Sequence, residues 1–129
     1  MKKTLLILSM VTLSGCATVQ SWIPSFWDDN QSAAIVTVHQ VIVNIDCQQS
    51  QLPQAAAIVN GLQWFRLYSE SKGALQQDVL RLMEPMEKTA KDWYNRNLQE
   101  PASQGYCESK KRIMIQQSER TTRSILGRW

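Results

Sequence analysis

Residues 53–72 read PQAAAIVNGLQWFRLYSESK and have the strongest helical pattern of apolar residues in the chain. Two neighbouring apolar stripes run along it at three- and four-residue steps, the spacing of one helix face. Pro53 suits the first turn of a helix and Gly73 suits its end. The first stripe is Ala55, Ile58, Leu62 and Phe65, and the second is Ala57, Gly61, Trp64 and Tyr68. A helix that is apolar over so much of its circumference is central or contacts a partner.

The preceding segment has a similar periodicity. Residues 28–30 are Asp28, Asp29 and Asn30, residue types that cap helices. The apolar residues that follow are Ala34, Ile35, Val38, Val41, Ile42 and Ile45. Their β-branched content is unfavourable in a helix and makes a strand the competing interpretation. The length of the segment and its imperfect alternation favour a helix.

A third helix is predicted from near Ala74 up to Pro101. Its apolar face keeps one phase for about twenty residues. The members of this face are Leu75, Val79, Leu82, Met86, Ala90 and Trp93. Pro85 cannot donate a backbone hydrogen bond, but the stripe continues across it. We therefore expect one helix with a kink at Pro85 and not two helices.

The last segment, residues 106–126, has a weaker stripe and a strongly basic composition. The stripe is Cys107, Met114, Ser118, Thr121 and Ile125. The basic residues are Lys110, Lys111, Arg112, Arg120, Arg123 and Arg128, against Glu108 and Glu119. The first segment has Asp28, Asp29 and Asp46 and no Lys or Arg, so the two segments suit each other as neighbours. The simpler interpretation of these basic residues is a solvated helix face that pairs with the acidic first segment. Binding to anionic lipid headgroups or cell-wall polymer is the alternative.

The N-terminus has the organisation of a secretory signal. Lys2 and Lys3 precede the run LLILSMVTL at residues 5–13, which is too short to cross a bilayer as a helix. The next residues, Leu13-Ser14-Gly15-Cys16, resemble the lipobox of bacterial lipoproteins. The resemblance implies that Cys16 carries lipid and becomes the first mature residue. By analogy with Gram-negative sorting, Ala17 in place of Asp favours the outer membrane. An ordinary signal peptide or an uncleaved apolar anchor is the alternative.

These features divide the chain into a signal peptide (1–15), a lipidated tether (16–29) and a periplasmic helical domain (30–129). The tether contains Trp22, Phe26 and Trp27 close to the lipid. These aromatic side chains are suited to the membrane–water interface. Folding back onto the domain is an equal alternative. Loss of Lys2 and Lys3 with the signal leaves 12 basic and 11 acidic residues, so the charge gives no reason to expect nucleic acid.

Cys47 and Cys107 remain as an even pair in an oxidising compartment, which predicts a disulfide. Closing a loop of about 60 residues stabilises by roughly 4 kcal/mol on the chain-entropy model. In an up-down-up-down bundle the end of the first helix and the start of the fourth lie together. The Cys pair, inferred from the compartment, therefore agrees with the topology inferred from periodicity. We predict an all-α, small up-and-down helical bundle with one disulfide.

No catalytic pattern stands out in the sequence. The only histidine, His39, has no marked partner, and Glu84, Glu87 and Asp92 have the spacing of a solvated helix face. Nucleophile-elbow, zinc-protease and phosphate-loop motifs are missing. We therefore expect no enzyme, metal or cofactor. A non-enzymatic scaffold or interaction module with a protein partner is the leading hypothesis, and a cell-wall enzyme is the weakest.

Two stretches look like segments of small uncharacterised lipoproteins encoded by tailed phages of marine bacteria. They are FWDDNQSA at residues 26–33 and GYCESKKRIM at residues 105–114. This resemblance implies no established activity, but it raises an outer-spanin-like role in lysis as an alternative. Many outer spanins are rich in proline, whereas this chain has four. A neighbouring gene for a membrane-anchored periplasmic coiled coil would favour the spanin hypothesis.

Trp64 and Tyr68 are the candidate partner-binding residues. They lie one turn apart on the second stripe of residues 53–72. Tyr and Trp are common interface anchors because they bury a large area and keep a polar tip. Burial of this stripe in the core is the preferred expectation, and a partner surface is the alternative.

Overall fold

The computed structural model describes residues 28–73 and 76–127. This part of the chain contains four helices and no strand. In chain order they are α3 (Asp29–Val43), α4 (Gln51–Ser71), α5 (Gln77–Gln99) and α6 (Gln104–Leu126). The prediction of an all-α bundle is confirmed, and the strand interpretation of the first segment is wrong because its apolar residues follow helical spacing.

Local chemistry explains the start of α3, the start of α6 and the end of α4. The Asp28 carboxylate accepts a hydrogen bond from the backbone N–H of Gln31 at 2.9 Å and caps α3. The Ser103 hydroxyl accepts from the N–H of Tyr106 at 3.2 Å and caps α6. Gly73 follows α4 with φ of +86°, a conformation that glycine adopts without strain.

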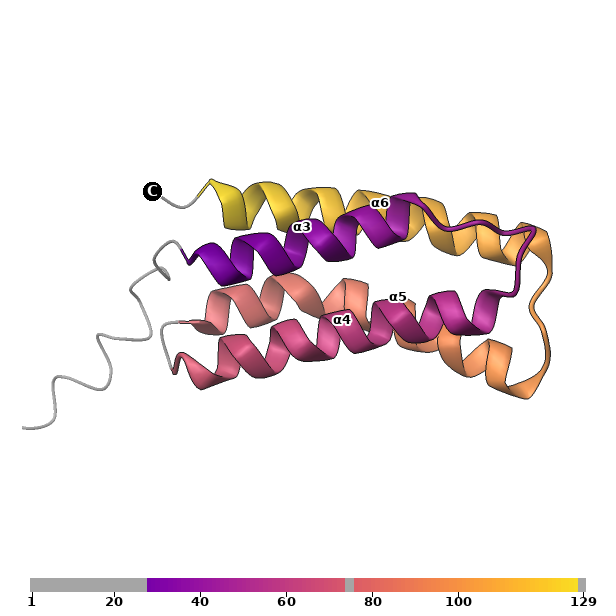
Figure 1. Ribbon diagram of the computed structural model, residues 1–129, viewed down its shortest axis with the longest axis horizontal. Helices are drawn as coiled ribbons and strands as arrows, with labels where there is room; N and C mark the ends of the chain where they lie inside the picture. Colours follow the sequence, from indigo (N-terminus) through magenta and orange to yellow (C-terminus); the bar gives the residue numbers. More distant parts are fainter. Residues whose placement is uncertain (1–27, 74–75, 128–129) are drawn as a thin grey trace, which may run out of the picture.

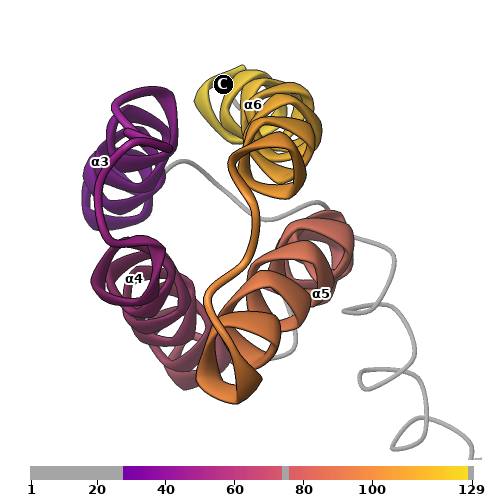
Figure 2. The same ribbon diagram turned by 90° about the vertical axis from the view of Figure 1, so that its right-hand side faces the viewer.

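The four helices form a ring in which each packs against its neighbours in sequence and α3 also packs against α6 (Figures 1 and 2). Successive helices run in opposite directions, as the up-and-down topology requires. The acidic start of the domain and the basic α6 are therefore neighbours, as predicted. The beginning of α3 and the end of α6 lie at one end of the bundle, which we call the tether end (Figure 1).

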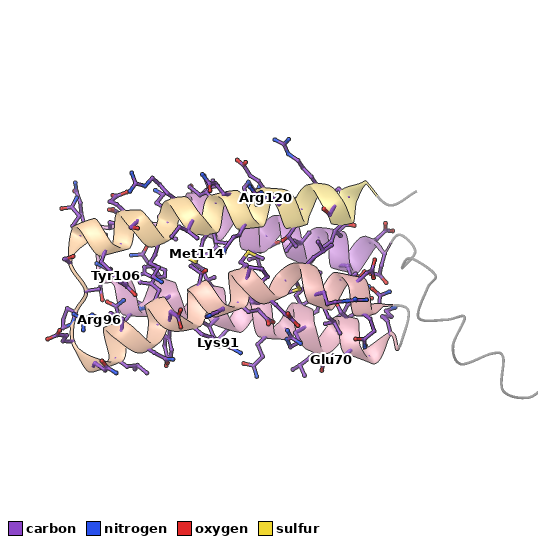
Figure 3. All side chains as sticks on the ribbon, turned by 180° about the vertical axis from the view of Figure 1, so that it is seen from behind. Glu70, Lys91, Arg96, Tyr106, Met114 and Arg120 are labelled. Atoms are coloured by element: carbon purple, nitrogen blue, oxygen red, sulfur yellow. A yellow bond between two sulfur atoms is a disulfide. The ribbon has the colours of Figure 1, made fainter. Side chains whose placement is uncertain are left out.

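The core is one continuous cluster that draws on all four helices. Its largest fully buried side chains include Trp93, Phe65, Met83, Met86 and Met114. Figure 3 shows Met114 directed into the bundle and Arg120 directed away from it. The first stripe of α4, whose residues are Ala55, Ile58, Leu62 and Phe65, is buried throughout, as expected.

The boundaries differ from the predictions in three places. Asp28 and Asp29, the last residues of the predicted tether, belong to α3 and its cap. Helix α3 stops at Val43, and Ile45 is buried from the following loop. The third helix begins at Gln77, later than predicted, and continues without interruption through Pro85.

The predicted inward stripe of α5 is confirmed at Val79, Met86, Ala90 and Trp93, which are fully buried, and it is wrong at Leu82. Met83 is fully buried, whereas Leu82 is exposed. Both residues are apolar and either one continues a three- and four-residue pattern from Val79, so the sequence alone selects the wrong one. Val41 of α3 is exposed for the same reason, because Val38 and Ile42 already fill the inward positions.

A disulfide joins Cys47, in the loop after α3, to Cys107 in the first turn of α6. The two Cα atoms are 5.7 Å apart. The predicted pairing is confirmed, and it closes the end of the bundle opposite the tether end. Lys111 strengthens the same junction, because its ammonium donates to the backbone carbonyl of Ile45 at 2.7 Å.

Buried amides tie the helices together at both ends of the core. Near the tether end, the Gln31 side-chain amide donates to Ser69 Oγ at 2.9 Å and to Gln76 Oε1 at 2.8 Å. At the opposite end, Trp93 Nε1 donates to Gln51 Oε1 at 2.9 Å. Satisfied polar pairs of this kind allow these buried amides to be tolerated in the core.

Candidate functional site

The second stripe of α4 faces outward, contrary to the preferred expectation that it is core. Trp64 is 52% exposed and Leu67, its neighbour one turn away, is 57% exposed. Tyr68 is partly buried. We call Trp64, Leu67 and Tyr68 the α4 surface. The core is filled by the first stripe, so the second stripe is left on the solvent side of the helix.

The two aromatic rings of the α4 surface are stacked on each other. The Trp64 and Tyr68 ring centroids are 5.2 Å apart and the ring planes differ by 7°. Lys72, one further turn along α4, places its ammonium 5.0 Å from the Tyr68 ring centroid. Stacking and the cation–π contact hold these side chains in one arrangement before any ligand is present. A pre-organised aromatic pair loses little conformational entropy when it binds.

A polar cluster fixes the edge of this surface at the tether end. The Tyr68 hydroxyl donates to the Asp28 carboxylate, 3.2 Å from each oxygen, and accepts from Asn30 Nδ2 at 3.0 Å. Lys72 forms an ion pair with Asp28 at 3.2 Å. Burial by itself would raise the pKa of Asp28. The hydrogen bonds from Gln31, Lys72 and Tyr68 outweigh it and hold that pKa below its ordinary value.

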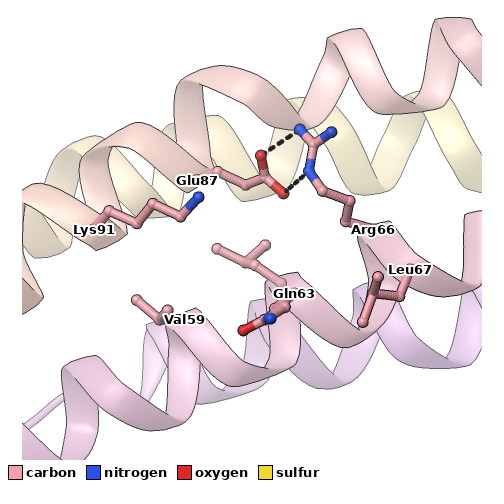
Figure 4. Close-up of a pocket in the computed structure, with 7 residues that line it drawn as sticks. Val59, Gln63, Arg66, Leu67, Glu87 and Lys91 are labelled. Carbon is pink, nitrogen blue, oxygen red and sulfur yellow. Dashed lines mark hydrogen bonds and ion pairs between the residues drawn. The ribbon is translucent and has the colours of Figure 1, made fainter. Parts of the chain in front are cut away.

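A pocket of about 240 Å³ lies beside the α4 surface, between α4 and α5 (Figure 4). Leu67 belongs to both features. Arg66 donates from Nε to Glu87 Oε1 at 2.7 Å and from Nη2 to Glu87 Oε2, so one wall is a two-bond ion pair. The lining residues are Val59, Leu62, Gln63, Arg66, Leu67, Glu87 and Lys91.

The Arg66–Glu87 pair revises the prediction for the carboxylates of α5. Glu84 and Asp92 are exposed, as predicted for a solvated helix face. Glu87 is buried and paired with Arg66, and this hydrogen bonding raises the pKa of Arg66 above its ordinary value. Glu87 therefore has a structural partner across the α4–α5 contact, a role that its sequence spacing did not reveal.

His39 has a partner from α6. Its Nδ1 lies 2.8 Å from Ser118 Oγ, and Ser118 is fully buried. Ser118 Oγ also lies 3.0 Å from the carbonyl oxygen of Ile115, to which its hydroxyl can donate. This contact joins α3 to α6.

Two basic residues of α6 contact neighbouring groups of the domain, and three others are exposed. Lys110 lies over the Tyr106 ring at 5.4 Å, and Lys111 binds the Ile45 carbonyl. Arg112, Arg120 and Arg123 are exposed, with Glu119 beside the last two. Arg128 lies outside the described residues. The expected pairing of α6 with the acidic first segment does not involve Asp28, which forms its ion pair with Lys72, the C-cap residue of α4.

Several predicted site residues lie outside the part of the chain that the structure describes. These are Cys16, Trp22, Phe26 and Trp27. Within residues 28–73 and 76–127, no helix is long and apolar enough to span a membrane. The same residues contain no group of three or more His, Cys, Asp or Glu side chains placed to hold a metal ion.

Comparisons with protein-family models, curated proteins and solved structures gave no match for this chain. The α4 surface and its adjoining pocket are therefore assigned from geometry alone.

Proposed function

We propose that this chain is an outer-membrane lipoprotein anchored by lipid at Cys16, whose periplasmic helical domain is a non-enzymatic interaction module. The main observation that supports this proposal is the exposure of the α4 surface. Trp64 and Leu67 are each more than half exposed on a bundle whose core is otherwise continuous. Large apolar side chains that the core does not use, stacked and fixed by a polar edge, are typical of a protein-binding surface.

The lipobox Leu13-Ser14-Gly15-Cys16 supports the anchor. Only eleven residues lie between Cys16 and Asp28, where α3 is capped. An extended chain of this length reaches at most about 40 Å. A lipid at Cys16 therefore keeps the domain close to the leaflet, and its partner belongs to the same membrane or to the adjacent periplasm.

The proposal is tested by capture of partners from cell envelopes, with the full-length lipidated chain as bait. Trp64→Ala removes the central ring of the α4 surface, and Ile113→Ala removes an exposed apolar side chain of α6. A partner of this surface is lost from the Trp64→Ala bait and retained by the Ile113→Ala bait. Equal capture by parent and both variants would reject the α4 surface as the binding site.

A further inference from the structure

The α4 surface has an apolar area that nothing in the described part of the chain covers. Leu67 is exposed at its centre and also lines the pocket between α4 and α5. Trp64 extends the apolar area on one side, and Val59 adds to the pocket on the other. Leu67 therefore connects the exposed Trp64 to the pocket, so that a short peptide segment can contact both.

The chain that precedes the described residues joins the domain beside this surface. Asp28 is the first described residue, and its carboxylate contacts the Tyr68 hydroxyl. Tyr68 in turn is stacked on Trp64. Trp27 is therefore covalently bonded to Asp28, whose carboxylate contacts the edge of the α4 surface.

The preceding segment has a composition that matches this apolar surface. Residues 17–27 read ATVQSWIPSFW and contain no charged side chain. Five of the six residues from 22 to 27 are apolar or proline, and three of them are aromatic. Six extended residues span up to about 20 Å. Trp64 and Leu67 lie within four residues of Tyr68, about 6 Å along the helix axis at 1.5 Å per residue, so the segment is long enough to reach both.

We propose that residues 22–27 dock on the α4 surface, with Phe26 and Trp27 against Trp64 and Leu67 and the chain directed toward the pocket. A short covalent connection gives the segment an effective concentration in the millimolar range, so a modest affinity suffices. This inference rests on the proposed function in one respect. If the α4 surface binds a partner, that partner has to displace residues 22–27. The docking itself requires neither lipid nor partner.

The test uses photo-crosslinking within the mature chain, residues 16–129, with Cys16→Ser so that no lipid competes. The change at Cys16 lies outside the core cluster that the described residues form, so we expect this chain to retain the folded domain. Phe26 is replaced by a benzoyl-phenylalanine, and the crosslinked residues are identified by mass spectrometry in the monomeric fraction. The expected products join position 26 to α4 between Val59 and Lys72. The same probe at Gln20 serves as the control and gives far less of these products.

Variants of the surface make the test specific. Trp64→Ala and Leu67→Ser each lower the crosslink yield about fivefold, the effect of losing an interface anchor worth about 1 kcal/mol. Ile113→Ala on α6 leaves the yield unchanged. Thermal unfolding of each variant shows whether the domain is still folded. Because two surface variants are used, the test still works if one of them does not fold.

Other occupants would give different products. Crosslinks between two chains would show that a second copy covers the surface and would overturn the proposal. The lipidated chain in phosphatidylethanolamine–phosphatidylglycerol vesicles provides the second arm. Crosslinks only to lipid there, with none to α4 in either arm, would place the aromatic residues in the leaflet instead. Failure of the proposed function is distinguishable, because partner capture can be lost while the intramolecular crosslink persists.

Discussion

The Tyr68 hydroxyl lies 3.2 Å from both carboxylate oxygens of Asp28 and joins α4 to the cap of α3. The same carboxylate accepts the backbone N–H of Gln31 and pairs with Lys72. One acidic side chain therefore caps the start of α3, fixes the edge of the α4 surface and marks the point where the preceding chain enters the domain. Its contacts make the tether end of the bundle sensitive to single substitutions.

Tyr68→Phe is expected to lower the free energy of unfolding by about 1 kcal/mol. The substitution keeps the aromatic ring and removes the hydroxyl that Asp28 and Asn30 share, and a net hydrogen bond contributes about that amount. Urea unfolding at neutral pH measures it. Tyr106→Phe provides the matched control, because Tyr106 contacts Lys110 through its ring, which the substitution keeps. An equal loss in both variants would contradict a specific role for the Asp28–Tyr68 contact.

The charge of Asp28 is expected to make the stability of the domain depend on pH in the acidic range. The pKa of Asp28 is lowered in the folded state, so its ionised form contributes stability that is fully present above the unfolded value, about 4. This contribution is lost as the pH falls through the lower, folded-state pKa. Asn is also a good helix cap, so Asp28→Asn removes the charge and keeps the cap.

Urea unfolding of the parent and of Asp28→Asn at pH 7 and pH 3 measures this contribution. At pH 7 the parent is expected to have a larger free energy of unfolding than Asp28→Asn. At pH 3 this difference between the two proteins is expected to be smaller. Glu108→Gln, at an exposed position of α6, controls for the removal of a carboxylate in general. A difference that widens toward pH 3 would mean that the sign of the Asp28 contribution is wrong.

Trp93 and Trp64 are expected to respond very differently to truncation. Trp93 is fully buried and donates to Gln51, whereas Trp64 is 52% exposed. Trp93→Ala should cost about 3–5 kcal/mol, the usual cost of removing a large aromatic side chain from a core. Trp64→Ala should cost under about 1 kcal/mol, because it removes mainly the stacking on Tyr68. Thermal and urea unfolding of the two variants beside the parent measure both values, and similar losses would place Trp64 in the core.

The helices and their order were predictable because a buried stripe leaves a three- and four-residue period in the sequence. Ile35, Ile58 and Ala90 all lie on predicted stripes and are buried. The prediction failed where two adjacent apolar residues compete for one inward position, as Leu82 and Met83 do. Periodicity sets the phase of a helix to within about one residue, and only the packing of neighbouring helices selects between the two.

The candidate site was predictable in part. Trp64 and Tyr68 were identified from the second stripe of α4, but their exposure depends on the ring of helices, which the sequence pattern does not specify. The sequence pattern did not indicate Leu67, which lies on neither stripe of α4. It did not indicate the Arg66–Glu87 pair either, since a charged pair from two helices has no fixed spacing in the chain. The contact between Asp28 and Tyr68 joins residues forty positions apart and likewise leaves no local pattern.

The disulfide is expected to form within one chain and to stabilise the domain substantially. Non-reducing mass spectrometry of protein from the periplasm should find Cys47 linked to Cys107. The double variant Cys47→Ser, Cys107→Ser should lose about 2–4 kcal/mol, since a loop with 60 residues of sequence separation is no longer closed in the unfolded chain. Two free thiols in the native protein, or a bond between two chains, would contradict this prediction.

The anchor prediction concerns Cys16 and is independent of the bundle. Acyl chains contribute roughly 0.8 kcal/mol per buried methylene, so a cysteine that carries several chains does not leave the membrane on a useful timescale. Cys16→Ser should therefore give unprocessed precursor or soluble periplasmic protein. Membrane fractionation and the electrophoretic mobility of the chain measure the two outcomes together.

The double variant Cys47→Ser, Cys107→Ser is the matched control, because it loses two cysteines and keeps Cys16. It should fractionate with the outer membrane like the parent, even though its domain is less stable. If Cys16→Ser also remains in the outer membrane with native mobility, lipid at Cys16 is not the anchor. Retention would then have to come from the aromatic residues of the tether or from the basic face of α6, and combining Cys16→Ser with Arg120→Gln and Arg123→Gln would separate these two sources.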